Sequence, residues 1–500
     1  MSQSRSCPAG PLSGGAPPGN PTLCGNSVYI IIRKPTIAKG HGRRKREFLM
    51  DVRENDFSTG SIPKNILSLA LPMTAAQLIN ILYNIVDRMY LGRIPDVGRL
   101  SLTGLGLCLP IISILMGFAN LCGMGGAPLC SICRGHGEEQ EAEYIMGNAF
   151  SLLLVFGVGL TVLGLIFKSP ILYLFGASEV TFPYADDYLT IYLLGTVFVM
   201  VGLGMNPFIN AQGFGRMGML TVALGAVVNI ALDPVFIFLL NMGVRGAALA
   251  TVIAQGCSAV WVLCFLTGRK TLLRLRLSTL RLRVGRVRRI LSLGMSGFMM
   301  NLTNSLVQVL CNATLENWGG DLYVSVMTVV NSIREVISMP IQGVTSACQP
   351  VLGYNYGAGA PARVRQGIRF TAGVTMAYSI VAWAVTMLAP GALIRMFNSE
   401  AALLEAGIPA FHIYFATFFF MSFQFIGQAV FVGLGRSHQA VFFSLLRKAF
   451  IVAPLTLLLP VMGWGVDGVF LAEPISNVVG GLACILTMYF TVYRPLGHPT

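Results

Sequence analysis

The chain has 500 residues, of which 54% are hydrophobic and 11% charged, and its formal net charge is +14 at pH 7. A water-soluble protein carries roughly a quarter charged residues, so this chain cannot cover a water-facing surface and a soluble fold is excluded. The apolar stretches are continuous and do not alternate with period two, which argues against a transmembrane β-barrel. The composition therefore predicts an all-α integral membrane protein.

The first 49 residues differ from the rest of the chain, because they are rich in Pro, Gly and Ser and then become basic. Their apolar run, Val28–Ile32, is too short for the hydrophobic part of a signal peptide. Residues 43–47 can be encoded entirely by purines, as a ribosome-binding sequence shortly before Met50 would be. Two interpretations stay open: Met50 is the true start, or residues 1–49 form a disordered cytoplasmic tail.

Apolar stretches near the length that a membrane-spanning helix needs, about 20 residues, then follow one another along the chain. The predicted spans are 64–91, 100–128, 144–167, 186–210, 217–241, 244–267, 287–315, 321–350, 366–389, 407–432, 438–462 and 464–490. Short polar breaks separate them. The sequence therefore predicts twelve transmembrane helices.

The two halves of the chain repeat one another. Ile66–Leu69 has the same residues as Ile290–Leu293, and Asn80 pairs with Asn304 at the same offset of 224 residues. Later matches keep an offset between 220 and 224, and this constant register indicates a duplication. Because each half has an even number of spans, both run in the same direction, which is a known transporter plan. The predicted organisation is an N-terminal extension at 1–56, an N-lobe with helices 1–6 at 57–268, a basic cytoplasmic linker at 269–286, a C-lobe with helices 7–12 at 287–490 and a cytoplasmic tail at 491–500.

Lys and Arg gather in alternate loops, as the positive-inside rule describes for cytoplasmic loops. The connection at 269–289 is the most basic of them and contains no acid. We therefore expect a multi-pass protein of the bacterial inner membrane with both termini in the cytoplasm. The same loops account for the net charge of +14, so nucleic-acid binding is not expected.

Two acids lie inside predicted spans of the first half, Asp87 and Asp233. An ionisable residue inside a span costs about 3 kcal/mol or more and is usually functional. Asn229 lies four residues before Asp233, and Tyr83 four before Asp87, so each pair shares a helix face. Pro234 frees a backbone carbonyl beside them. A proton or sodium site is one interpretation, because loss of water favours the protonated carboxylate. A hydrogen-bonded structural anchor is the other.

At the matched positions the second half has Cys311 and Ala453, so the fold itself does not demand these acids. The second half has acids of its own in Glu335 and Glu473, for which a functional role and a structural link across the bundle both stay open. Three further charged residues are expected to reach water from the ends of their spans: Glu316, Arg447 and Lys448.

Several motifs in combination resemble the multidrug and toxin extrusion (MATE) family. They are Ile66–Pro72, Tyr83–Asp87, Asn229–Pro234, Gly246–Thr251 and Gln349–Ala358. The resemblance covers roughly residues 57–490 and is greatest to the bacterial MepA-like and DinF-like branch. It implies the MATE fold, in which two pseudo-symmetric six-helix lobes form a V around a central cleft.

The resemblance also implies the site residues. In that branch the ion-coupling site corresponds here to Asp87, Asp233, Asn229 and Thr251, and we add Tyr83, which shares a face with Asp87. A coupling sodium ion would bind at Asp87 and Asp233. The family's polar fourth-span residue falls on Phe208, with an asparagine on either side. For the substrate cleft we expect Asn206, Asn210, Glu335, Glu473 and Gln308.

We therefore expect a secondary active multidrug efflux antiporter that exchanges cationic or amphiphilic drugs for protons or sodium ions. It should have no catalytic residues, no cofactor besides the coupling ion, and a monomeric state in the lipid membrane. A flippase of lipid-linked saccharide is the alternative from the same superfamily, and it would favour a strongly cationic cleft. A non-transporting membrane scaffold or enzyme is the alternative of another class.

Overall fold

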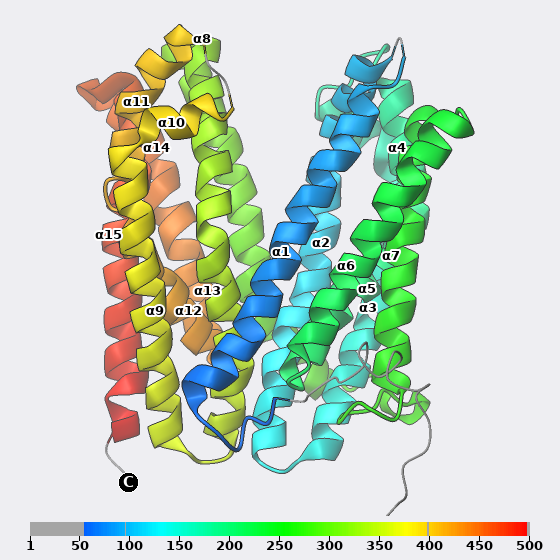
Figure 1. Cartoon of the computed structure of the whole chain (residues 1–500), viewed down its shortest axis with the longest axis vertical. Coiled ribbons are helices and arrows are strands. Elements are labelled where there is room, and N and C mark those ends of the chain that lie inside the picture. The colour runs from blue at the N-terminus through cyan, green and yellow to red at the C-terminus, as the bar shows by residue number, and fades with distance from the viewer. Residues whose placement is uncertain (1–54, 96, 398–399, 498–500) are drawn as a thin grey trace, which may run out of the picture. The chain divides into compact units, whose positions relative to one another are not determined.

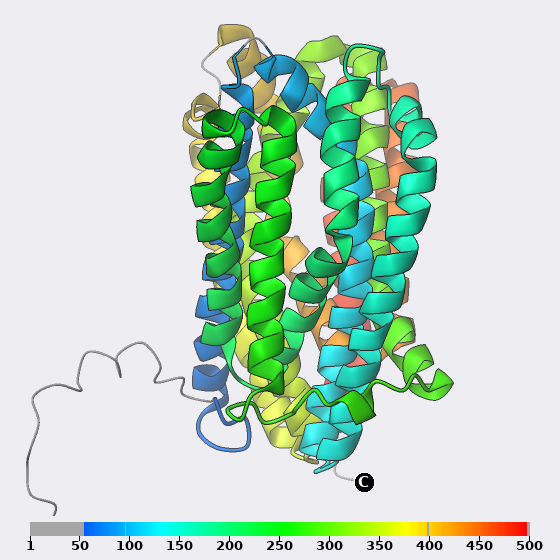
Figure 2. The same ribbon diagram turned by 90° about the vertical axis from the view of Figure 1, so that its right-hand side faces the viewer.

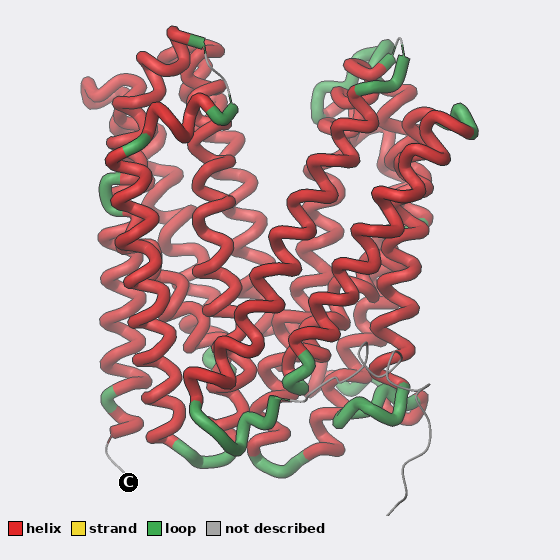
Figure 3. The backbone as a smooth tube through the Cα atoms, viewed as in Figure 1, coloured by secondary structure: helices red, strands yellow, loops and turns green. Residues whose placement is uncertain are grey.

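Helices joined by short loops make up the described part of the chain, and no strand occurs in it (Figure 3). The structure, a computed structural model, describes residues 55–95, 97–397 and 400–497. These residues belong to one compact unit that runs from Val52 to Thr500. The two interpretations of residues 1–49 lie outside the described residues.

The first half forms seven α-helices, two of which make one broken span. They are α1 (Ile62–Gly92), α2 (Gly98–Gly135), α3 (Glu139–Leu174), α4 (Phe182–Leu194), α5 (Thr196–Ala211), α6 (Gly215–Pro234) and α7 (Gly243–Thr267). Between α4 and α5 the chain bends by 58°. A Cβ on Gly195 at this bend would lie 2.4 Å from the Val252 side chain of α7, so the close packing requires glycine.

The second half contains the remaining helices and several π-helical turns. They are α8 (Val284–Gly357), α9 (Pro361–Leu388), α10 (Pro390–Arg395), α11 (Ala401–Phe415), α12 (Met421–Gly433), α13 (Ser437–Leu445), α14 (Ala453–Leu459) and α15 (Gly465–Met488). The π-helical turn η5 (Leu446–Val452) joins α13 to α14, and η6 (Pro460–Trp464) follows α14. A bend of 41° separates α11 from the segment that contains α12.

The helix α8 is two spans and not one. Its 74 residues would be about 110 Å long at a rise of 1.5 Å per residue, whereas the hydrocarbon core of a bilayer is about 30 Å thick. The break is at Gly320, whose φ of 68° and ψ of −171° are not helical. The stretch Ser437–Gly497 is divided in the same way by Gly463 and Gly465, with φ values of 99° and 53°.

Eight described segments are long and apolar enough to cross a membrane, or ten if each bent pair counts as one span. Two of these segments, α8 and Ser437–Gly497, each contain two spans, which brings the number to twelve. The prediction of twelve transmembrane helices in two halves is therefore confirmed. The helices of both halves run along one common direction (Figures 1 and 2).

The helix α1 packs with both halves. Its first turns, with Ile62, Ile66 and Leu69, share an apolar core with α8, α9 and α12 of the second half. Further along, α1 lies against α6 of the first half. In Figure 1 it runs obliquely from one bundle to the other. A boundary that assigns all of 57–268 to the N-lobe therefore divides a continuous core.

Glycines bring the backbones of α2 and α8 together where the halves meet. A Cβ on Gly125 would lie 2.1 Å from the carbonyl oxygen of Ile290, and one on Gly357 would lie 2.1 Å from that of Ile132. Small residues allow membrane helices to approach this closely. The contacts involve the later part of α2 and both ends of α8, so the halves are joined at one end of the bundles (Figure 1).

The segment that precedes α1 joins the halves at the same end. Asn55 donates its backbone N–H to the carbonyl of Gly213 in the first half at 3.3 Å. Arg363 of the second half donates to the carbonyl of Phe57 at 3.0 Å. The Phe57 side chain is 1% exposed, and the guanidinium of Arg134 lies 5.9 Å from its ring centroid. Residues 55–57 therefore pack as part of the helical unit.

The basic connection predicted at 269–286 also packs against the helices. The side-chain carbonyl of Gln212 accepts the hydroxyl of Thr271 at 2.6 Å and the backbone N–H of Leu273 at 2.8 Å. Leu273 is buried. The following helix begins at Val284, slightly earlier than predicted. These contacts hold the linker against the first half.

Candidate functional site

Two carboxylates of the N-lobe are buried and make no salt bridge with a described residue, although Arg88 lies within electrostatic range of Asp87. Asp87 on α1 is 8% exposed and Asp233 on α6 is 0% exposed. Their helices pack against one another, and Asp87 lies within electrostatic range of Asp233. Among the described residues, Asp87 Oδ1 and Asp233 Oδ2 have no hydrogen-bond partner and no salt bridge includes either acid. The carboxylates can therefore accept a proton or bind a cation.

Asn229 connects Asp233 to a third helix. Its side-chain Nδ2 donates to Asp233 Oδ1 at 3.2 Å and to the Thr251 hydroxyl of α7 at 3.4 Å. The first of these bonds confirms that Asn229 and Asp233 share a helix face. Asn229 Oδ1 has no partner within the described part of the chain, so it adds a third free oxygen.

The helix changes from α-helical to π-helical geometry directly after Asp233. The helix α6 ends at Pro234 and continues as the π-helical turn η2 (Val235–Leu239). Proline lacks an N–H and so leaves a carbonyl of the preceding turn without its usual partner. Short π-helical turns within helices often mark functional sites. The local backbone thus provides a carbonyl oxygen without its usual hydrogen-bond donor beside the carboxylate.

A cavity of about 40 Å³ borders this group and is lined by α1, α5, α6 and α7. Tyr83, Asn229 and Thr251, three of the five residues expected at the ion-coupling site, line it, whereas Asp87 and Asp233 are not among its lining residues. A water molecule needs about 10–15 Å³, so the cavity admits a small guest. The free acceptors here are all oxygens, which suit a proton or a hard cation.

Within the described ranges, no group of three or more His, Cys, Asp or Glu side chains could hold a metal ion. The oxygens of Asp87, Asp233 and Asn229 form a smaller set. A sodium ion at Asp87 and Asp233 therefore stays a prediction.

A larger cavity of about 510 Å³ lies between the halves, and we call it the cleft. Residues of α1, α2, α5 and α6 line one side, and the second segment of α8 lines the other. Asn206, Asn210 and Glu335, which the sequence analysis expects at a substrate cleft, line it, and Glu335 is the one charged residue among its described lining. The structure does not bring Gln308 or Glu473 to this cleft, because both line a separate cavity of the second half.

Three amides of the cleft were not anticipated, namely Gln77, Asn120 and Gln342. A single neutral amide in an apolar helix can face a cleft or a neighbouring helix, and the sequence does not distinguish the two. Asn80 and Asn206 line both the cleft and the small N-lobe cavity. The two cavities therefore share a wall.

The family model described as MatE matches residues 72–235 and 298–458, one stretch in each half. The chain belongs to the MatE family. This confirms the resemblance to the MATE family. It also makes the chain a multi-pass membrane transporter and not an enzyme.

Two relatives carry the same name. This MATE chain is 23% identical to the multidrug export protein MepA of Staphylococcus haemolyticus over 437 residues, which are 87% of this chain and 94% of the relative. It is 22% identical to MepA of Staphylococcus aureus over 437 residues, which are 87% of this chain and 95% of the relative.

Solved structures share the fold. One is a multidrug resistance MATE family transporter of the MOP superfamily in an outward-facing conformation, with a TM-score of 0.83 at 22% identity. Another is a MOP superfamily transporter from Pyrococcus furiosus, also with a TM-score of 0.83 at 22% identity. Each match covers 89% of this chain and 99% of the solved one. The twelve-helix MATE fold is thus confirmed.

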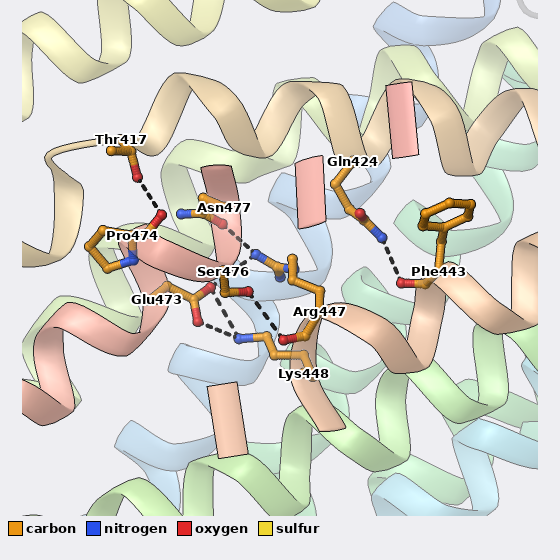
Figure 4. Close-up of polar contacts among 9 residues, drawn as sticks. All are labelled: Thr417, Gln424, Phe443, Arg447, Lys448, Glu473, Pro474, Ser476 and Asn477. Atoms are coloured by element: carbon orange, nitrogen blue, oxygen red, sulfur yellow. Dashed lines mark hydrogen bonds and ion pairs between the residues drawn. The ribbon is translucent and has the colours of Figure 1, made fainter. Parts of the chain in front are cut away.

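In the C-lobe of this MATE transporter, Glu473 of α15 is part of an ion-paired group (Figure 4). Its Oε1 accepts Arg447 Nη1 at 3.0 Å and Lys448 Nζ at 3.1 Å, and its Oε2 accepts Lys448 Nζ at 2.9 Å. Arg447 Nη1 also donates to Asn477 Oδ1 at 2.7 Å. The three charged side chains are buried.

The prediction that Arg447 and Lys448 reach water from a helix end is wrong. Their span begins at Ser437, so Arg447 lies ten residues inside it. That corresponds to about 15 Å at the helical rise, near the middle of a hydrocarbon core of about 30 Å. Glu473 stabilises both charges in place. Glu316, in contrast, is exposed and lies just before the break in α8, as predicted.

Proposed function

We propose that this MATE transporter exports cationic or amphiphilic small molecules across the bacterial cell membrane in exchange for protons or sodium ions. Asp87 and Asp233 bind the coupling ion, with Asn229, Thr251 and Tyr83 around them. The observation that carries the proposal is the pair of buried acids with free oxygens beside a cavity that shares a wall with the cleft. The naming of the two staphylococcal relatives as multidrug export proteins supports the substrate class.

The charge of the cleft favours this function over a flippase of lipid-linked saccharide. A phosphorylated saccharide substrate would need cationic side chains along its path. Among the described residues that line the cleft, the one charged side chain is the acid Glu335. A cation therefore fits the cleft better than an anion does.

The shared wall offers a route for coupling. The helix α1 holds Asp87 near one end and contributes Gln77 and Asn80 to the cleft. A proton or sodium ion at the acids reduces the repulsion between Asp87 and Asp233, which permits α1 and α6 to come closer. Movement of α1 then changes the cleft. Antiport requires that ion and drug prefer different states of the lobe.

The basic loops define the orientation of the transporter in the membrane in this proposal. The linker at 269–286 and the segment before α1 lie at the end where the halves are joined (Figure 1). We assign that end, and with it both termini, to the cytoplasm by the positive-inside rule. The transporter acts as a monomer.

Transport in everted membrane vesicles tests the proposal. Ethidium uptake driven by an imposed proton or sodium gradient should fall at least about tenfold in Asp233→Asn, which keeps the shape of the side chain but removes its charge. Glu405→Gln is the matched control, because Glu405 is exposed on α11. It should transport within about twofold of the wild type. Gradient-driven uptake that survives in Asp233→Asn would remove this residue from the coupling site.

A further inference from the structure

The group around Glu473 contains more positive charge than an ion pair needs. Arg447 and Lys448 share the single carboxylate of Glu473, and Arg334 of α8 lines the same cavity. Three cations thus face two described acids, Glu473 and, within electrostatic range of Arg334, Glu335. A buried charge is costly unless it is paired and hydrogen-bonded. The structural role of the ion pair explains one cation, and the excess needs another partner.

Arg334 is the one of these three cations that makes no salt bridge with a described residue, although Tyr414 and Glu473 lie within electrostatic range of it. Its Nε has no hydrogen-bond partner, and no hydrogen bond joins its side chain to another described residue. The cavity that it lines has a volume of about 40 Å³. Its polar lining consists of Arg334, Lys448, Glu473, Asn304, Gln308, Asn331, Tyr414 and the thiol of Cys311. Guanidinium, ammonium and amide N–H groups are the donors that carboxylate and phosphate oxygens accept.

This cavity is the C-lobe counterpart of the small N-lobe cavity. Asn304 matches Asn80 in the internal repeat, and each asparagine lines the cavity of its own lobe. Glu473 and Thr251 correspond in the same way. The two cavities thus have the same place in the repeat and differ in charge. No charged side chain lines the first, where Asn229 of the lining hydrogen-bonds to Asp233, whereas Arg334, Lys448 and Glu473 line the second.

We propose that the C-lobe cavity binds the carboxylate or phosphate group of an anionic or zwitterionic amphiphile, whose apolar body extends towards the cleft. Gln308 is exposed, so the edge of the cavity is open. Lys448 also lines a neighbouring cavity of about 100 Å³, which shares Gln342 with the cleft. The site goes beyond the proposed export of cations, because it accepts the opposite charge, and its test requires binding and not transport.

Two xanthene dyes of similar shape and opposite charge test the site on purified full-length protein in phosphatidylcholine nanodiscs. Fluorescence anisotropy should show saturable binding of fluorescein, which carries a carboxylate, and of the cation rhodamine 123. Arg334→Gln should lower the affinity for fluorescein at least about tenfold, as expected for the loss of a charge-assisted hydrogen bond. The affinity for rhodamine 123 should change by less than about twofold. Arg334→Lys should retain most of the affinity for fluorescein.

Arg288→Gln is the control for the net positive charge of the protein, because Arg288 is exposed at the start of α8. It should leave the binding of both dyes unchanged. On the wild type, benzoate should displace fluorescein and benzyltrimethylammonium should not, a comparison that does not depend on any variant. Fluorescein affinity that is equal in the wild type and Arg334→Gln, or lost equally in Arg288→Gln, would overturn the proposal.

A second pair of nanodiscs identifies the natural source of the anionic group. Phosphatidylglycerol in the bilayer should compete with fluorescein if the ligand is a lipid headgroup. Unchanged fluorescein affinity in those nanodiscs would assign the cavity to soluble carboxylates or phosphates. Both results require that Arg334→Gln lowers the affinity for fluorescein.

Discussion

The stability of the C-lobe should depend strongly on Glu473. Glu473→Gln keeps the size of the side chain but removes the charge that Arg447 and Lys448 contact at 2.9–3.1 Å. Removal of one partner from a buried ion pair costs about 3–5 kcal/mol, because the remaining charge stays desolvated. Two cations lose their partner here, so we expect a decrease in the free energy of unfolding of about 5 kcal/mol, at the upper end of that range.

A surface ion pair provides the matched comparison. Asp187 pairs with Arg245 at 2.9 Å, but the two side chains are 35% and 63% exposed. Asp187→Asn should therefore cost no more than about 1 kcal/mol. Denaturant titration of the purified protein in a mild detergent measures both variants. The double variant Lys448→Met with Glu473→Gln removes one cation together with the acid, and it should recover part of the loss.

Equal decreases in the free energy of unfolding of Glu473→Gln and Asp187→Asn would refute the reasoning. They would mean that water screens the charges of the buried group as effectively as those of the surface pair. A double variant less stable than Glu473→Gln alone would also contradict it. In that case Lys448 would contribute through packing of its side chain and not through its charge.

Two further predictions concern the joint between the halves, and one measurement concerns the start of the chain. Gly125→Val places a Cβ 2.1 Å from a carbonyl oxygen of α8 and should abolish monodisperse protein on size-exclusion chromatography, whereas Gly106→Val, with open space around its Cα, should not. Phe57→Ala removes a fully buried ring from a large apolar core. It should lower the free energy of unfolding, measured by denaturant titration, by about 3–5 kcal/mol. Mass spectrometry of natively expressed protein distinguishes the two interpretations of residues 1–49, because a peptide from residues 1–40 is expected only from a cytoplasmic tail.

The twelve spans could be predicted from the sequence because span length and apolar character are local properties of the chain. The bend between α4 and α5 could not, since it depends on a tertiary contact. Gly195 there lies against Val252, which is distant in the sequence. The contact of α1 with both halves cannot be predicted from the sequence for a similar reason. The sequence gives its membership of the first repeat, whereas the packing of Ile66 in the core of the second half appears only in three dimensions.

The same distinction separates the two charged groups. Asn229 and Asp233 are one helical turn apart, so their contact follows from the helical repeat alone. Arg447 and Glu473 are on consecutive spans, and nothing local in the sequence states that they meet. An acid or a base in a span must be neutralised, but the chain can do this with its own side chains or leave the task to a ligand. Asp87 and Asp233 make no salt bridge among the described residues, whereas Glu473 makes two. The duplicated frame therefore holds a cavity near two acids without a salt bridge in one lobe and a cavity lined by two cations and one acid in the other, and our two proposals rest on this difference more than on the shape of either lobe.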